Sequence, residues 1–219
     1  MHEGMCKMQT SEIVAELSKG GLTASEAYDF EQALFTRWRE GKDLAPLVNL
    51  LASEITDQRM RGIYYLGELA RFVPELNEAA LLLADDPLAQ GRRAFVIYVG
   101  RSNVNEQRTL VGLATCLIDL DLNVRASVLA WSVSTTDEAF INFSSLVQGG
   151  QGAIKSRKWR EYDMARGARG LQIASRIRSG DALDLIRRET PGEDSYTFDY
   201  LKSYVRRLRT HREPSSSEP

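Results

Sequence analysis

The chain has 219 residues and a formal net charge of −2 at pH 7, and its 43% apolar and 26% charged residues are typical of a soluble globular protein. No run of about 18 apolar residues is present, and the N-terminal MHEGMCKMQT lacks the apolar core of a secretion signal, so we expect a cytoplasmic protein with no membrane span. The two histidines, His2 and His211, lie near the termini, which argues against Ser–His–Asp or Cys–His catalysis and against a zinc site of His and Cys.

The predicted elements are helices throughout. Apolar residues follow helical spacing along almost the whole chain, and no stretch shows the sustained period-two alternation of a strand. Helix starts are indicated by the capping-box spacing of Thr23 with Glu26 and of Thr135 with Glu138. Six helix pairs are predicted, over residues 11–40, 43–70, 74–101, 105–134, 137–178 and 181–211.

Two segments fall outside this helical pattern. The run QGGQG interrupts the fifth pair and predicts a mobile loop over residues 148–153. The final EPSSSEP, residues 213–219, has the composition of a disordered tail. We therefore expect one folded domain over residues 1–212, followed by that tail.

Three arginines spaced by 33 residues are the centre of a repeated pattern. A large aromatic residue follows each arginine by six positions, and an aspartate precedes the second and the third by six positions. Self-similarity at such a period is typical of stacked supersecondary units that bury a common interior. The arginines are Arg59, Arg92 and Arg125, the aromatic residues are Tyr65, Tyr98 and Trp131, and the aspartates are Asp86 and Asp119.

An acidic residue in a turn, six positions before an arginine that opens the second helix of a pair, resembles the pattern of short HEAT-type repeats. Asp119 and Arg125 match this pattern, whereas Gly91 stands where a valine is usual and Ser53 stands in place of the first aspartate. The resemblance covers residues 43–134. It implies an all-α fold, a right-handed superhelix of about six stacked antiparallel helix pairs.

The resemblance also implies a structural ladder, in which turn carboxylates accept hydrogen bonds from an arginine of a neighbouring repeat. A charged pair at a packed junction fixes geometry and performs no chemistry. Binding of an acidic ligand by the same arginines is the alternative interpretation. The ladder residues are Asp86, Arg92, Asp119, Arg125 and, without an aspartate of its own, Arg59.

The three repeated aromatic residues have two interpretations. By the 3.6-residue period they lie about 100° around the helix from the core-facing position of Val99. They either form an aromatic ridge that lines the groove of the superhelix and anchors a partner, or seal the junctions between successive repeats. The residues are Tyr65, Tyr98 and Trp131.

Residues 155–178 predict a helix with an aromatic and basic stripe opposite its apolar face. Such a stripe suits contacts to phosphates and stacked rings, and it equally suits an acidic protein surface. The alternative is a solvated face that pairs with the acidic N-terminal part, since residues 1–152 carry 13 basic against 20 acidic side chains and residues 153–219 carry 15 against 10. The stripe consists of Trp159, Tyr162, Arg166, Arg169 and Arg176.

These patterns predict binding rather than catalysis. We expect a non-catalytic protein-interaction module that uses the groove, either a compact adaptor or a toxin-neutralising immunity protein, and its partner is another protein. No cofactor, metal or membrane is expected, because the chain has neither metal-ligand spacing nor a phosphate loop. The alternative is nucleic-acid binding, since some HEAT-like proteins are alkylpurine DNA glycosylases. No catalytic aspartate can be matched by motif, and whether the chain is an enzyme stays open.

Overall fold

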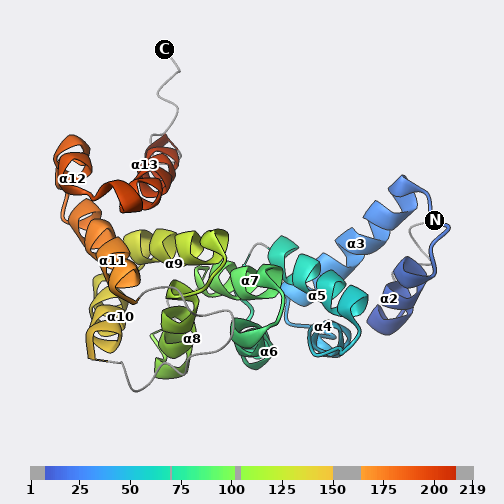
Figure 1. Cartoon of the computed structure of the whole chain (residues 1–219). Helices are drawn as coiled ribbons and strands as arrows, with labels where there is room; N and C mark the ends of the chain where they lie inside the picture. The colour runs from blue at the N-terminus through green and yellow to red at the C-terminus, as the bar shows by residue number, and fades with distance from the viewer. Residues whose placement is uncertain (1–7, 70, 102–104, 150–163, 211–219) are drawn as a thin grey trace, which may run out of the picture. The chain divides into compact units, whose positions relative to one another are not determined.

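The described part of the chain is helical throughout. The computed structural model describes residues 8–69, 71–101, 105–149 and 164–210, and these ranges contain α-helices and short 3₁₀ turns with no strand (Figure 1). The predicted all-α class is therefore confirmed. The chain divides into two compact units between residues 102 and 103, and each unit is described by itself.

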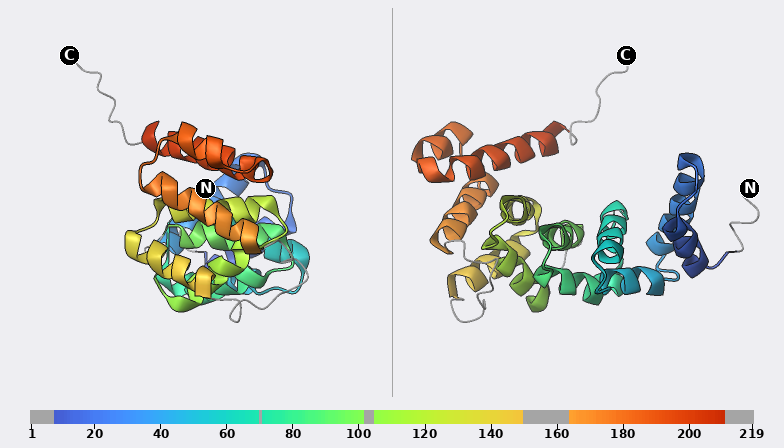
Figure 2. Two further views of the ribbon diagram at one scale, coloured as in Figure 1. Left: turned by 60° about the vertical axis from the view of Figure 1, so that its left-hand side comes forward. Right: turned by 45° about the vertical axis from the view of Figure 1, so that its right-hand side comes forward.

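The first unit consists of helices that contact their neighbours in the chain. α4 packs on α5, and α5 lies side by side with α7, the next long helix (Figures 1 and 2). The helices begin and end close to the predicted boundaries of the first three pairs. The elements are α2 (Thr10–Lys19), α3 (Ala24–Arg39), α4 (Ala45–Leu51), α5 (Thr56–Glu68), η1 (Pro74–Leu76), α6 (Asn77–Leu82), η2 (Leu83–Asp85) and α7 (Ala89–Val99).

The predicted capping box starts α3. Thr23 Oγ1 accepts the Glu26 N–H at 3.3 Å, and the Glu26 carboxylate accepts the Thr23 N–H at 2.9 Å. Both N–H groups would otherwise lack a partner within the helix. The hydrogen bonds from Thr23 lower the pKa of Glu26, because they stabilise its charged form.

The C-terminal end of α5 is held by two arginines. Arg39 of α3 donates to the carbonyls of residues 68 and 69, and Arg101 donates to the carbonyls of residues 66 and 67. The last carbonyls of a helix have no partner within the helix, and cations are favourable at that end. The two guanidinium groups satisfy this need, and they attach the end of α5 to α3 and to the residues that follow α7.

The second unit is built around α9. α8 packs on one side of α9, while α11 and α13 also contact it, and α13 lies on the side that faces away from α8 (Figures 1 and 2). The elements are α8 (Gln107–Leu117), α9 (Leu122–Ser134), α10 (Asp137–Gly149), α11 (Met164–Arg178), α12 (Leu183–Glu189), η3 (Gly192–Asp194) and α13 (Ser195–Thr210).

Side chains cap two helix starts in this unit, and one of these caps differs from the prediction. Asp121 caps α9, because its carboxylate accepts the N–H groups two and three residues later at 2.8 and 3.2 Å. At α10 the capping hydroxyl belongs to Thr136, which accepts the Ala139 N–H at 3.3 Å, and not to Thr135 as its spacing from Glu138 predicted. A shift of one residue at a helix end changes which side chain can reach the unpaired N–H groups.

The predicted glycine-rich loop and tail fall largely outside the described residues. α10 continues through Gly149, so residues 148 and 149 of the expected loop are helical instead, as a glycine tolerates the end of a helix. α11 begins at Met164. Residues 150–163 and the expected tail, residues 213–219, lie outside the described part of the chain.

Arg178, the last residue of α11, connects three helices. Its guanidinium donates to the carbonyls of Ser132, Val133 and Thr135 at the end of α9, and it pairs with Asp137 at the start of α10. The arginine thus gives hydrogen-bond donors to the last carbonyls of α9. Its partner Asp137 lies in the first turn of α10, where a negative charge is favourable. This single side chain fixes α11 against the junction of α9 and α10.

Candidate functional site

The three repeated arginines bind the backbone of their own turns. In each case Nη1 donates to the carbonyl six residues earlier, at 2.7 Å for Arg59 and at 2.8 Å for Arg92, and Arg125 makes the same hydrogen bond. Because the acceptor is a main-chain carbonyl, the side chain at this position is not needed for the hydrogen bond. Ser53 therefore accepts from Arg59 although the other two turns have an aspartate at the equivalent position. These arginines therefore shape the turns that precede α5, α7 and α9.

Asp86 lies buried in the turn before α7 and uses both carboxylate oxygens. Its Oδ1 accepts the Leu88 N–H at 2.7 Å, and its Oδ2 lies 3.0 Å from Nε of Arg59 in α5. This ion pair joins an arginine of one repeat to the turn carboxylate of the next. Asp119 is also buried, and its Oδ1 accepts the Asp121 N–H at 2.8 Å. Both aspartates thus have structural contacts in the turns that they start.

The repeated aromatic residues lie in the interior of their units. Tyr65, Tyr98 and Trp131 are 2%, 1% and 5% exposed. Such rings offer almost no surface to a partner, so the structure places them as packing residues and not as an exposed ridge. The reason is that aromatic neighbours cover them: the ring centroids of Trp38, Phe72 and Phe143 lie 5.5, 5.2 and 5.1 Å from those of Tyr65, Tyr98 and Trp131.

Burial also sets the ionisation of the two tyrosines. The pKa of Tyr65 and of Tyr98 is raised to about 12, chiefly by burial of the hydroxyl. The Tyr98 hydroxyl accepts the Val73 N–H at 3.2 Å and donates to the Val73 carbonyl. Both phenols are therefore neutral members of the core.

The arginines at the start of α11 form ion pairs within the second unit. Arg169 binds Asp194 through Nε at 2.6 Å and Glu193 through Nη2 at 2.5 Å. Arg166 donates to the Glu193 carbonyl at 2.7 Å, and its Nε lies 3.6 Å from Asp194. These contacts attach α11 to η3 and to the start of α13.

The third arginine of the predicted stripe is paired in the same way. Arg176 lies 2.8 Å from Asp181 and 2.7 Å from Glu189, and the hydrogen bond to Asp181 is the main cause that raises the pKa of Arg176. The carboxylates that form these ion pairs with the arginines of the stripe thus come from the C-terminal part of the chain itself. The aromatic members of the stripe, Trp159 and Tyr162, lie outside the described residues.

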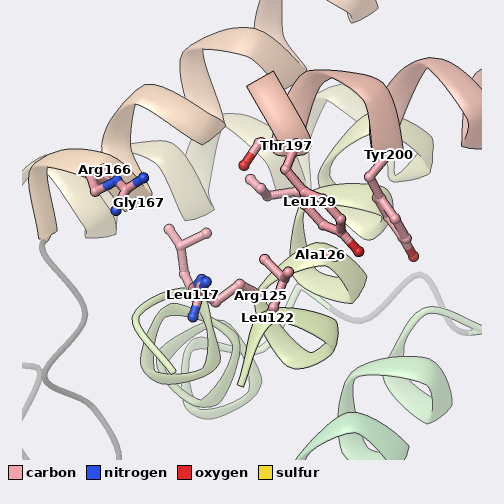
Figure 3. A pocket seen from close by; sticks show the side chains of 10 residues that line it. Leu117, Leu122, Arg125, Ala126, Leu129, Arg166, Gly167, Thr197 and Tyr200 are labelled. Carbon is pink, nitrogen blue, oxygen red and sulfur yellow. The ribbon is translucent and has the colours of Figure 1, made fainter. Parts of the chain in front are cut away.

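A small cavity lies where α9, α11 and α13 meet. Figure 3 shows Arg166 of α11 on one side and Thr197 and Tyr200 of α13 on the other, with Ala126 and Leu129 of α9 between them. Its volume is about 10 Å³, roughly the space that one water molecule needs. The three helices therefore pack closely, and the cavity is too small for an organic ligand.

A surface that the sequence pattern did not single out lies on α5 and α7. Tyr64 of α5 is 50% exposed, and Ile97 of α7, 33 residues later, is 36% exposed. One turn earlier on the same helices, Met60 is half-buried and Arg93 is exposed. α5 and α7 contact each other, and the four positions that they share at the 33-residue spacing are here named the α5–α7 strip.

Charges of both signs surround Tyr64. Its ring lies 5.5 Å from that of the buried Tyr65, and partial burial, Glu31 and Glu68 together raise the pKa of Tyr64. Burial and the nearby Glu68 raise the pKa of Glu31, while Arg61 opposes this shift. A neutral phenol among carboxylates and a guanidinium offers both apolar area and hydrogen bonds, which suits contact with a protein surface.

The equivalent surface of α9 is covered by the chain itself. Ala126 and Ala130 occupy the repeat positions of Arg93 and Ile97, and both alanines are buried. Ala126 lines the small cavity together with residues of α11 and α13, and both of these helices contact α9. The same face of the repeat is thus covered in α9 and exposed in α5 and α7.

A sequence signal for this surface did exist. Tyr64 and Ile97 each directly precede a repeated aromatic residue, and both are large where the third copy has Ala130. A large apolar residue next to a packing residue on a helix points away from the core face by about 100°. In the third copy this position is Ala130, a small residue that is buried.

Neither a membrane-spanning helix nor a metal-binding cluster occurs in the described ranges. There, no helix has the length and apolar character to cross a membrane, and no three or more His, Cys, Asp or Glu side chains gather where they could hold a metal ion. Comparison of the chain with protein-family models, with curated proteins and with solved structures finds no match.

Proposed function

We propose that this chain is a non-catalytic protein-binding module and that the α5–α7 strip is its contact surface. One observation carries the proposal: the repeat face that α9 buries under α11 and α13 is exposed on α5 and α7, where it presents Tyr64 and Ile97. Tyrosine is among the residues that contribute most to protein interfaces, since its ring adds apolar area and its hydroxyl a hydrogen bond.

The proposal includes the HEAT-like architecture that the sequence resembles, a right-handed superhelix of stacked helix pairs. The arginine-to-carbonyl hydrogen bonds repeated at Arg59, Arg92 and Arg125 support it, as does the ion pair between Arg59 and Asp86. In such an arrangement α5 and α7 are the second helices of their pairs. Stacked repeats of this kind present extended surfaces for binding, and we propose a partner in the cytoplasm.

Nucleic-acid binding, including the excision activity of HEAT-like glycosylases, is less well supported. Arg169 and Arg176 already pair with carboxylates, and no catalytic aspartate stands out among the described residues. A duplex binder needs cations that face phosphates. DNA affinity at low salt that falls in an Arg166→Glu/Arg169→Glu variant would favour this alternative; affinity that is absent or unchanged would exclude it.

The protein-binding proposal is tested with two matched variants of the full chain. Tyr64→Ala/Ile97→Ala truncates the α5–α7 strip, whereas Leu82→Ala truncates a leucine on α6 that is 66% exposed. Quantitative mass spectrometry compares the proteins recovered with each variant from cells that express the chain, after circular dichroism has verified equal helix content. We expect at least one protein to be lost with the strip variant and kept with Leu82→Ala. Identical recoveries would contradict the proposal.

A further inference from the structure

We infer that the partner contacts the α5–α7 strip with an amphipathic α-helix that lies across both helices. This inference rests on the proposed function, because it names the form of the partner at the same surface. It comes from the way in which the chain covers the equivalent face in its second unit. There the covering element is a helix of this chain, and its contacts are known in detail.

α13 covers the repeat face of the second unit. It contacts both α9 and α11, two neighbouring helices that are themselves in contact. Thr197 and Tyr200 line the small cavity with Ala126 of α9 (Figure 3). The Tyr204 hydroxyl donates to Ser134 Oγ at the end of α9 at 3.2 Å. The face of the second unit is thus covered by a helix, α13, that contacts two adjacent helices, α9 and α11.

α13 has the pattern of a helix that binds in this way. Phe198, Leu201 and Val205 are buried and follow one another by three and four residues, whereas Asp199 and Ser203 between them are exposed. Apolar residues at this spacing form one face of a helix. Recognition of an amphipathic helix through such anchors is a general mode of peptide binding.

The strip differs from the face of α9 in the size of its side chains. Ala126 lies beside α13 at the small cavity and Ala130 is also buried, whereas the equivalent residues on α5 are Met60 and Tyr64. Ridges of one helix pack into the grooves of the other, so large residues on one side require small ones opposite. We therefore expect the partner helix to carry small residues where it crosses Tyr64 and larger apolar residues on either side.

The test uses the full chain with a photoreactive benzophenone amino acid in place of Tyr64 or, separately, of Ile97. The chain is irradiated in cells that express it, and mass spectrometry maps the labelled residues of the partner. The axes of packed helices are roughly 8–10 Å apart. This distance corresponds to about six to seven residues of a helix, at about 1.5 Å each (roughly two turns), and to about three residues of an extended segment, at about 3.3 Å each.

We expect both probes to label one protein, at positions about seven residues apart, two turns that bring both positions to the same face of a helix, and a control probe at Leu82 to leave that protein unlabelled. Labels about three residues apart, or labels on two different proteins, would overturn the helical occupant but would leave a partner at the strip. No label from either probe, together with unchanged recoveries for Tyr64→Ala/Ile97→Ala, would overturn the proposed function as well.

A second measurement tests the helical form directly. A proline placed midway between the two labelled positions of the partner interrupts a helix but fits an extended segment. We expect the affinity of the purified partner for the full chain to fall by at least about tenfold, whereas an alanine at the same position changes it little. Equal affinities of the proline and alanine variants would overturn the helical occupant.

Discussion

Arg59 and Asp86 belong to successive copies of the repeat pattern, and Arg59 Nε lies 3.0 Å from Asp86 Oδ2, with the aspartate side chain only 4% exposed. Asp86→Asn keeps an acceptor for the Leu88 N–H but removes the charge that faces Arg59. Because Arg59 remains partly solvated, we expect a decrease of about 2–3 kcal/mol in the free energy of unfolding, near the lower end for a broken buried pair. Urea denaturation followed by circular dichroism measures the change.

A matched control for this variant lies on the same helix as Arg59. Asp57 is exposed in the first turn of α5, so Asp57→Asn should change the free energy of unfolding by less than about 1 kcal/mol. If Asp86→Asn had an equally small effect, the ion pair would contribute little, and the repeats would be held together by apolar packing alone.

Two glycines of α5 should respond in opposite directions to alanine. A Cβ at Gly62 would lie 2.8 Å from the backbone nitrogen of Leu51 in α4, so Gly62→Ala must separate the two helices. We expect this variant to lower the free energy of unfolding by about 1–3 kcal/mol. A Cβ at Gly67 would meet nothing within 4 Å, so Gly67→Ala should raise the free energy by up to about 1 kcal/mol. Urea denaturation of both variants decides whether α4 and α5 approach as closely as described.

Tyr98 makes the stability of the fold depend on pH in the alkaline range. Burial raises the pKa of Tyr98 to about 12 from the ordinary value of 10.0. The folded state favours the protonated phenol, so its contribution is fully present below pH 10 and is lost as the pH rises towards 12. We expect the ultraviolet absorbance of phenolate to show tyrosines that ionise only near the upper end of this range.

Phenylalanine substitution separates the hydrogen bonds of Tyr98 from its packing. Tyr98→Phe removes the hydrogen bonds with Val73 and should lower the free energy of unfolding at neutral pH by about 1–2 kcal/mol. It should also reduce the loss of stability above pH 10. Tyr28 is 61% exposed, and Tyr28→Phe should change neither quantity. A Tyr98→Phe variant with the alkaline profile of the wild type would contradict the assigned pKa.

The helices could be predicted because their start signals and apolar periods are local. Thr23 and Glu26 are three residues apart, and their capping box depends on no other part of the chain. The spacing of 33 residues likewise predicted that Arg59, Arg92 and Arg125 occupy equivalent places, and each binds the carbonyl six residues earlier. Such features can be read from sequence because a helix or a turn forms among neighbours in the chain.

The candidate site could not be predicted because it depends on which helices cover others. Spacing alone left Tyr98 and Trp131 between core and surface, and tertiary packing placed both inside. The partner of Arg169 lies 25 residues away at Asp194, which no helical period connects to it. Tyr64 is 50% exposed among the described residues of its unit, whereas α13 contacts α9, and that difference arises only when the whole unit packs.

Asp194 and Glu193 provide a matched pair for the contact between α11 and α13. Arg169 binds both carboxylates, yet the Asp194 side chain is 3% exposed and that of Glu193 is 58% exposed. Loss of an exposed pair costs about 0–1 kcal/mol, so Glu193→Gln should have a small effect. Asp194→Asn leaves two arginines beside a neutral amide in a buried position, and we expect the free energy of unfolding to fall by about 2–3 kcal/mol.

Hydrogen exchange locates the effect of these two variants. If the ion pairs with Asp194 hold the start of α13, the amides around Phe198 and Leu201 should exchange faster in Asp194→Asn than in Glu193→Gln, while those of α8 change less. Equal exchange in α13 for both variants would mean that apolar contacts with α9 hold the helix without this cluster. Faster exchange confined to Asp194→Asn would instead show that the arginines of α11 serve the fold of the chain, which leaves them less available to phosphates.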